Sequence, residues 1–246
     1  MNFCGLEINC HHLNDLLKDT GSCKILVTVN AEAVVRAQKD AKLLKIINSN
    51  YASIDGQIPL WLYRWKYKGI DICKLSGSDL IYDVAAWAEK SHKKIFLLGG
   101  RQDSNEESVL KLKEKYPALE IAGYSPEYAP YPFSKERNDE ILSKVEAFLP
   151  DIIFVGFGMG KQEYWSSDNL DYLNRIGVRL LVGSGGTFEF VSGKIKRAPR
   201  FVQKCGLEGF WRLFNEMKWF RVKRLLLSFK IFPIYFSHHV MHSPNT

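Results

Sequence analysis

Nearly continuous apolar runs alternate with helix-like segments along most of this chain. The runs 24–30, 93–100, 151–158 and 178–186 are rich in Val, Ile, Leu and Phe, and each ends in small or polar residues. Such runs are typical of strands buried on both faces, and parallel neighbours need a crossover helix between them. The pattern predicts an α/β fold with a Rossmann-like, doubly wound parallel sheet.

The ends of these runs indicate where a ligand is expected. In open parallel sheets, ligands bind beyond the carboxyl ends of the strands. The first run ends at Thr28 and Asn30, which alternate and would share one face. Asn30 could equally cap a helix that begins at Ala31. The second run ends at Gly99 and Gly100, so the rule selects these positions as well.

The glycine turn 156–160 has the chemistry of a phosphate-binding turn without a complete motif. Lys161 stands where a dinucleotide fingerprint requires its third glycine, and no Ser or Thr follows it to make a P-loop. Glycines such as Gly158 still let backbone N–H groups approach an anion closely, and the helix start that follows favours negative charge. Lys161, Gln162 and Glu163 would direct polar groups at that ligand. A solvated turn, or a nucleotide-binding oxidoreductase, is the alternative.

Asp55 lies within the mainly apolar stretch 51–65. A carboxylate at the rim of an apolar environment has a raised pKa and can act as a general base. The alternative is a plain Asp-Gly turn with Gly56.

The charge of the chain is concentrated at its C-terminal end. The 246 residues have a formal net charge of +7, yet residues 190–246 hold eleven lysines and arginines against two acidic residues. We therefore divide the chain into an α/β catalytic domain, 1–192, and a basic, aromatic-rich helical appendage, 193–246. On one helical wheel, Phe210, Phe214 and Met217 form a stripe that Arg221 and Arg224 continue.

This appendage predicts an anionic partner, either a membrane surface or a pyrophosphate ligand. No uninterrupted apolar run is long enough to span a bilayer, so peripheral association is expected. An ordinary core-packing helix and a non-enzymatic membrane adaptor are the alternatives. Nucleic acid is not expected, since no recognition motif accompanies the charge.

Cysteine and histidine usage suggests neither a metal nor a redox cofactor. The five cysteines are scattered without a C-x-x-C pair, and no metal-ligand or nucleophile motif occurs. The composition fits a reducing cytosol, and the N-terminus lacks the features of a signal peptide.

Several motifs, in this order, resemble the WecG/TagA/CpsF glycosyltransferase family, glycosyltransferase family 26. The resemblance covers roughly residues 5–225 and rests on VTVNAE (27–32), Ile54-Asp55-Gly56, SGSD (76–79), FLLGG (96–100), VGFGMGKQE (155–163), GSGGTFEF (183–190) and GKIKRAPR (193–200), followed by GLE (206–208) and WRL (211–213). The family commonly has a proline where this chain has Gly160.

The resemblance implies a metal-independent, inverting glycosyltransferase at the cytoplasmic face of the cell membrane. It would move a sugar from a UDP donor to a glycan on a polyprenyl-pyrophosphate lipid. Asp55 matches the proposed general base, with Thr28 and Asn30 beside it, and Gln162 matches a donor-site residue. The remaining expected substrate contacts are Gly99, Gly100, Gly158, Lys161, Glu163, Gly185, Gly186, Thr187 and Glu189, with Arg212, Arg221 and Arg224 for the pyrophosphate. No cofactor is expected, and a homo-oligomer stays open. The donor is of the N-acetylmannosamine type or a related hexose or uronic acid.

Overall fold

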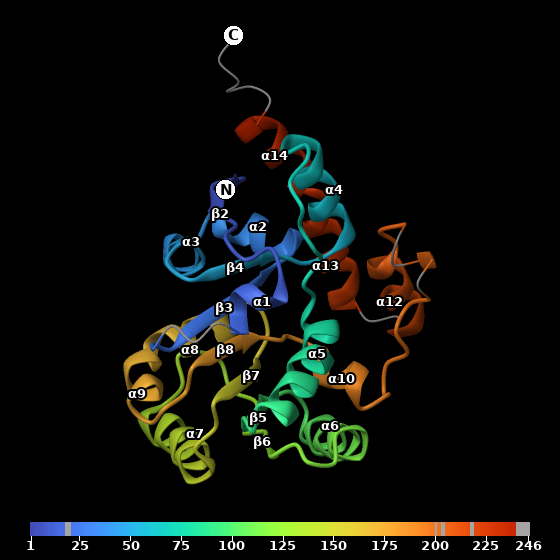
Figure 1. The fold of residues 1–246 in the computed structure, drawn as a ribbon. Coiled ribbons are helices and arrows are strands. Elements are labelled where there is room, and N and C mark those ends of the chain that lie inside the picture. Colours follow the sequence, from blue (N-terminus) through green and yellow to red (C-terminus); the bar gives the residue numbers. More distant parts are fainter. Residues whose placement is uncertain (18–20, 200, 203–204, 217–218, 240–246) are drawn as a thin grey trace. The chain divides into compact units, whose positions relative to one another are not determined.

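The computed structural model describes residues 1–17, 21–199, 201–202, 205–216 and 219–239. The chain forms two compact units. Figure 1 shows its helices and strands. Unit 1 comprises Met1–Asp15, Thr28–Ser76 and Arg197–Thr246, and unit 2 comprises Leu16–Val27 and Gly77–Lys196.

One six-stranded sheet has the strand order β4-β3-β8-β7-β5-β6. Its strands are β3 (Lys24–Val29), β4 (Tyr51–Ile54), β5 (Ile95–Gly99), β6 (Ile121–Tyr124), β7 (Ile152–Gly156) and β8 (Leu180–Gly183). The β3–β8, β8–β7, β7–β5 and β5–β6 pairs are parallel, with Ile152 opposite both Ile95 and Leu180. Helices flank the sheet, and the predicted α/β class is confirmed.

All four predicted strands are present, each shorter than its apolar run. The runs extend past the strands because small residues of the following turns, such as Gly100 and Gly158, are apolar in character but not extended. Sequence patterns missed β4 and β6. Their sequences, YASI and IAGY, are interrupted by Ser53 and Gly123, and β4 precedes an apolar helix that hides its boundary.

Along the chain, the helices of unit 2 come before, between or after its parallel strands. They are α5 (Gly77–Lys90), α6 (Gln102–Lys115), α7 (Lys135–Phe148), α8 (Lys161–Asp168), α9 (Leu170–Arg175) and α10 (Thr187–Val191). Helix α6 packs against β5, β6 and α10, whereas α8 packs against β7 and β8. The side chains of β5, β7 and β8 are buried, whereas Ala122 and Tyr124 of β6 are partly exposed, so most of the core follows from the apolar runs.

A buried asparagine fixes the carboxyl end of β5. The Asn105 side chain on α6 donates hydrogen bonds to the carbonyl oxygens of Leu97, 2.9 Å, and Gly99, 2.8 Å. A Cβ at position 123 on β6 would overlap the Asn105 Oδ1 atom, so this strand position requires glycine. Asn105 thereby satisfies two strand carbonyls where the chain leaves the sheet.

Unit 1 begins with a small antiparallel hairpin, β1 (Asn2–Phe3) and β2 (Leu6–Glu7). The short helix α1 (Leu13–Leu17) comes next along the chain and is divided between the two units. The other helices of unit 1 are α2 (Ala31–Ala37), α3 (Ala41–Asn48), α4 (Gln57–Lys66), α12 (Glu208–Glu216), α13 (Trp219–Phe229) and α14 (Ile231–His239).

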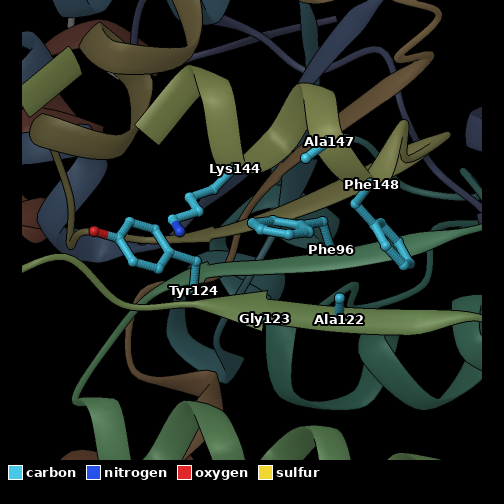
Figure 2. Close-up of a pocket in the computed structure, with 7 residues that line it drawn as sticks. All are labelled: Phe96, Ala122, Gly123, Tyr124, Lys144, Ala147 and Phe148. Atoms are coloured by element: carbon cyan, nitrogen blue, oxygen red, sulfur yellow. The ribbon is translucent and has the colours of Figure 1, made fainter. Parts of the chain in front are cut away.

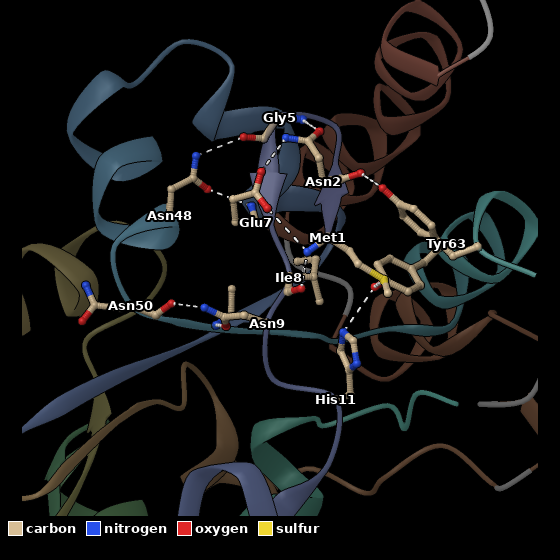
Figure 3. Close-up of polar contacts among 12 residues, drawn as sticks. Met1, Asn2, Gly5, Glu7, Ile8, Asn9, His11, Asn48, Asn50 and Tyr63 are labelled. Carbon is tan, nitrogen blue, oxygen red and sulfur yellow. Dashed lines mark hydrogen bonds and ion pairs between the residues drawn. The ribbon is translucent and has the colours of Figure 1, made fainter. Parts of the chain in front are cut away.

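Figure 3 shows how side-chain amides attach the hairpin to its neighbours. Asn48 at the end of α3 accepts from the Glu7 backbone N–H, 2.9 Å, and donates to the Gly5 carbonyl, 3.1 Å. The Tyr63 hydroxyl of α4 donates to the Met1 sulfur, 3.1 Å, and lies 3.3 Å from His11 Nε2. Burial raises the pKa of Tyr63 to about 12, so its hydroxyl stays protonated.

The C-terminal helices fold back on one another. Helix α13 packs against α12 and α2, and α14 packs against α2. The Phe210 ring of α12 lies 6.3 Å from the Phe229 ring of α13. One straight helix would separate these residues by about 28 Å, so the predicted stripe is divided between two helices.

Candidate functional site

The turn after β7 depends on the conformational freedom of glycine. Gly158 and Gly160 have φ values of 87° and 91°, which side-chain-bearing residues rarely adopt. Helix α8 starts directly afterwards at Lys161. The predicted glycine turn and the helix start behind it are therefore both present.

Two buried side chains of α8 join this turn to the turn after β8. Glu163, 1% exposed, accepts hydrogen bonds from the Gly160 N–H, 2.6 Å, and from Gln162 Nε2, 2.8 Å. Gln162, 2% exposed, accepts in turn from the Gly185 N–H, 3.0 Å. We call Gln162 and Glu163 the α8 clamp. It fixes the orientation of the Gln162 amide, because oxygen and nitrogen each have a defined partner.

The turn between β8 and α10 holds buried polar atoms that have no partner among the described residues. Thr187 Oγ1 donates to the Ser184 carbonyl, 2.7 Å. Ser184 Oγ and Glu189 Oε2 are both buried, and within the described part of the chain neither has a hydrogen-bond partner. Gly186 lies beside the second of these, since a Cβ there would come 3.4 Å from Glu189 Oε2. Buried polar atoms of this kind call for a ligand or an ordered water.

The N-terminus of α5 approaches the same turn. A Cβ on Gly77 would lie 2.9 Å from Thr187 Oγ1 and 3.3 Å from the Ser184 Cα, so only glycine permits this approach. The positive end of a helix dipole, on a helix of fourteen residues, therefore borders the turn.

Gly99 and Gly100 serve the packing of two aromatic rings. A Cβ would come within 2.7 Å of the Phe157 ring at Gly99 and of the Phe188 ring at Gly100. The Gly100 N–H donates to the Gly156 carbonyl, 3.0 Å, and its carbonyl accepts from Ser125 Oγ, 2.7 Å. Direct substrate contact by these two glycines stays a prediction.

Lys161 holds the proline- and tyrosine-rich loop of residues 125–134. Its ammonium donates to the Ala129 carbonyl, 2.8 Å, and lies 4.1 Å from the centre of the Tyr128 ring. Farther along the loop, Tyr131 donates to Asp168 at the end of α8, 2.5 Å. Burial and the Asp168 carboxylate raise the pKa of Tyr131, which keeps this donor protonated.

In unit 1, the three predicted catalytic residues lie at the carboxyl ends of β3 and β4. Thr28 is buried on β3, and Asn30 Oδ1 caps α2 by accepting from the Ala33 N–H, 3.0 Å. Asp55 directly follows β4, where its N–H donates to the Val29 carbonyl, 2.9 Å. Gly56 then starts α4 with a φ of 87°. The capping role considered for Asn30 is confirmed, and the Asp55 carboxylate stands between a strand end and a helix start.

Two buried polar residues were not singled out from the sequence: Ser184, in the turn after β8, and Glu32, in the helix after β3. Glu32, in the first turn of α2, is buried and pairs with Arg36 at 2.7 Å. The signal for both was a polar residue inside an otherwise apolar or glycine-rich run.

Arg212 lies on α12, and Arg221 and Arg224 lie on α13. Their side chains fall outside the described part of the structure. Across the residues that are described, no three His, Cys, Asp or Glu side chains gather in a way that could hold a metal ion. Nor does any described helix have the length and apolar character to cross a membrane.

An open hollow of about 350 Å³ lies elsewhere in unit 2 (Figure 2). It sits between α7 and the β5–β6 edge of the sheet and is lined by Phe96, Ala122, Gly123, Tyr124, Lys144, Ala147 and Phe148. None of the predicted site residues lines it, so we do not assign the candidate site to this hollow.

The fold defines a parallel α/β protein with glycine turns after adjacent strands, joined by buried polar side chains. Within that class, the model of the glycosyl transferase WecG/TagA/CpsF family matches residues 1–243. The chain belongs to this family. It is also similar to the N-acetylglucosaminyldiphosphoundecaprenol N-acetyl-beta-D-mannosaminyltransferase of Bacillus subtilis (strain 168). The two are 29% identical over 200 residues, which cover 80% of this chain and 74% of the relative.

Proposed function

We propose that this glycosyltransferase moves a sugar from a UDP donor, with inversion and without a metal, to a glycan on a polyprenyl-pyrophosphate lipid. The name of the Bacillus subtilis relative describes transfer of N-acetylmannosamine to undecaprenyl-diphosphate-linked N-acetylglucosamine. Its 29% identity leaves a related hexose or uronic acid open as the donor sugar. The pathway would be the synthesis of a cell-surface polysaccharide.

The observation that carries this proposal is the pair of turns joined by the α8 clamp. Three helix N-termini follow or border these turns, those of α5, α8 and α10, and such termini favour phosphate oxygens. Ser184 Oγ and Glu189 Oε2 are suited to ribose or sugar hydroxyls, because a hydroxyl can donate to either oxygen. We assign the donor to these turns, with Gly158, Gly185, Gly186 and Thr187 as backbone or side-chain contacts.

In this proposal Asp55 is the general base. An acceptor hydroxyl has a pKa far above neutrality, so its proton must pass to a carboxylate as the oxygen attacks the anomeric carbon. The new carbon–oxygen bond forms as the bond from that carbon to UDP breaks, which inverts the configuration. Backbone N–H groups of the turns would stabilise the departing phosphate charge, together with Arg212, Arg221 or Arg224. Thr28 and Asn30 would orient the base or the acceptor.

The appendage would hold the enzyme at the cytoplasmic face of the membrane. Phe210, Phe214, Trp219, Phe229 and Phe236 on α12, α13 and α14 are exposed, and aromatic rings of this kind settle at headgroup depth. Because α13 and α14 pack against α2, point changes test this role better than truncation. We expect Phe214→Ser/Trp219→Ser to float less with anionic vesicles, and an unchanged bound fraction would remove the role of these rings.

The test of the reaction is a product assay in chelator. Purified protein is incubated with EDTA, a short-chain prenyl-pyrophosphate glycan, and UDP-N-acetylmannosamine, UDP-glucuronic acid or UDP-hexoses, and products are identified by mass spectrometry. We expect one donor to give product and Asp55→Asn to lose about 100-fold to 10,000-fold in rate. Asp71→Asn, which changes an aspartate that is 90% exposed, is the matched control. Wild-type turnover by Asp55→Asn would refute the base, and absence of product from every donor would refute the reaction.

A further inference from the structure

Helix α4 has an exposed aromatic face in addition to its buried one. Leu60, Leu62 and Tyr63 are buried, whereas Trp61 and Trp65 are 48% and 55% exposed. The two tryptophans are four residues apart, so their indole rings lie on the same face of the helix. Exposing two large indole rings side by side to water is unfavourable unless another apolar phase covers them.

This face continues onto the C-terminal helices. The Trp65 ring stacks on Tyr235 of α14, with centres 5.8 Å apart and planes 24° apart, and meets the edge of Phe236 at 6.1 Å. A Cβ on Gly206 would lie 3.4 Å from the Trp61 ring, so the segment before α12 runs along this indole. Figure 1 shows α4 alongside the C-terminal helices.

The charged residues of helix α4 itself are all basic. Residues 57–70 contain Arg64, Lys66 and Lys68 and no acidic residue, and all three basic side chains are exposed. A second copy of the same face, related by a twofold axis, would bring like charges together. Anionic lipid headgroups would instead neutralise these charges while the indole rings enter the interface.

We propose that α4 is a membrane-docking helix, in which Trp61 and Trp65 enter the headgroup region of an anionic bilayer and the neighbouring basic residues bind its phosphates. What this docking means for the reaction rests on the proposed function. Helix α4 begins two residues after Asp55, and Trp61 lies about 6 Å along the helix axis from Gln57. One rigid helix thus connects the candidate base with the surface where a lipid-linked acceptor presents its first sugar.

Vesicle flotation of the full chain tests the proposal directly. Wild-type protein should bind phosphatidylglycerol vesicles, bind phosphatidylcholine vesicles more weakly, and lose binding in high salt. Trp61→Gln/Trp65→Gln should lower the partition coefficient at least tenfold. Leu110→Gln, which changes an exposed leucine on α6, is the control and should bind like the wild type. A double variant that folds and partitions within twofold of the wild type overturns the proposal.

A second measurement covers the case in which Trp65→Gln loosens α14. Trp61→Phe/Trp65→Phe keeps aromatic packing, and its fluorescence is compared with that of the wild type on brominated phosphatidylglycerol vesicles. The wild type should be quenched by a larger fraction of its emission than this variant. Equal quenched fractions overturn the proposal. It is also overturned if the wild type is a dimer that does not bind vesicles and the Gln variant is a monomer.

An activity comparison separates this inference from the proposed function. The Gln variant should lose more activity on an acceptor embedded in vesicles than on a water-soluble short-chain acceptor, relative to the wild type. Equal losses would overturn the docking role of α4. If the wild type makes no product with either acceptor, the proposed reaction fails while the flotation result still stands.

Discussion

Replacing Gly183 by alanine tests whether the α8 clamp is as closely packed as its distances indicate. The backbone at Gly183 does not have a positive φ, so alanine introduces no backbone strain there. Its Cβ, however, would lie 2.7 Å from Gln162 Nε2 and 3.1 Å from Glu163 Oε1. Since Cβ atoms essentially never approach so closely, the Gln162 side chain must move.

Moving Gln162 breaks one buried and one partly buried hydrogen bond. The Gly185 N–H loses its acceptor at 3.0 Å, and Glu163 loses the donor at 2.8 Å. A buried polar group left unsatisfied costs about 1–3 kcal/mol, so Gly183→Ala should lower the free energy of unfolding by about 2–5 kcal/mol. Gln162→Ala should cost a similar amount for the same reason.

The double variant tests whether the cost of Gly183→Ala comes from crowding against Gln162. In Gly183→Ala/Gln162→Ala, the new methyl group enters space that the glutamine has left. Its cost should therefore be smaller than the two single costs combined, by about 1–3 kcal/mol. Urea unfolding followed by circular dichroism measures all three variants. Gly186→Ala is the control, because its φ is −92° and its Cβ makes only an ordinary contact at 3.4 Å. It should stay within about 0.5 kcal/mol of the wild type.

Two results would refute this reasoning. If Gly183→Ala unfolds like the wild type, the clamp has room that the distances exclude. If the single costs add within about 0.5 kcal/mol, the methyl group and Gln162 do not compete for the same space.

Two further predictions concern acid stability and thiol reactivity. Burial and the nearby Lys66 ammonium lower the pKa of His239 to about 4, against about 6.5 in the unfolded chain. Between pH 4 and 6.5 the unfolded chain binds a proton on His239 that the folded protein does not. The His239 contribution to the free energy of unfolding is therefore full above pH 6.5 and is lost toward pH 4. The loss is about 1 kcal/mol for this partly exposed ring. In a plot of melting temperature against pH, His239→Gln should have a smaller slope between pH 4 and 6.5. A wild-type slope in the variant would contradict the role of His239. Among the thiols, Cys73 is exposed and should react quickly with an aromatic disulfide at pH 7. Burial raises the pKa values of the Cys4, Cys10 and Cys23 thiols to about 12. These three thiols should therefore react only after unfolding in urea. Their rapid reaction in the folded protein would contradict this expectation.

The sequence determined the class of fold, because strands buried on both faces need continuous apolar runs and leave a pattern that is readable without coordinates. It also located the turns 156–160 and 183–186, where Gly158, Gly160 and Gly185 have a positive φ that glycine adopts readily. It did not reveal β4 or β6, whose sequences YASI and IAGY lack the continuous Val, Ile, Leu and Phe run that marks the equally short β8. The end of α12 was also hidden, because an apolar stripe on a wheel does not show where a helix turns back.

Only the tertiary structure decided what the polar residues contact. Lys161, Gln162 and Glu163 are adjacent in sequence, yet the lysine holds a loop while the other two connect separate turns. The charge of the C-terminal segment was evident from composition alone. That this segment packs beside Trp61 and Trp65 of α4 was not. The Lys161–Ala129 and Gln162–Gly185 contacts join positions more than twenty residues apart. Packing selects such pairs by shape and burial, which a linear pattern does not encode.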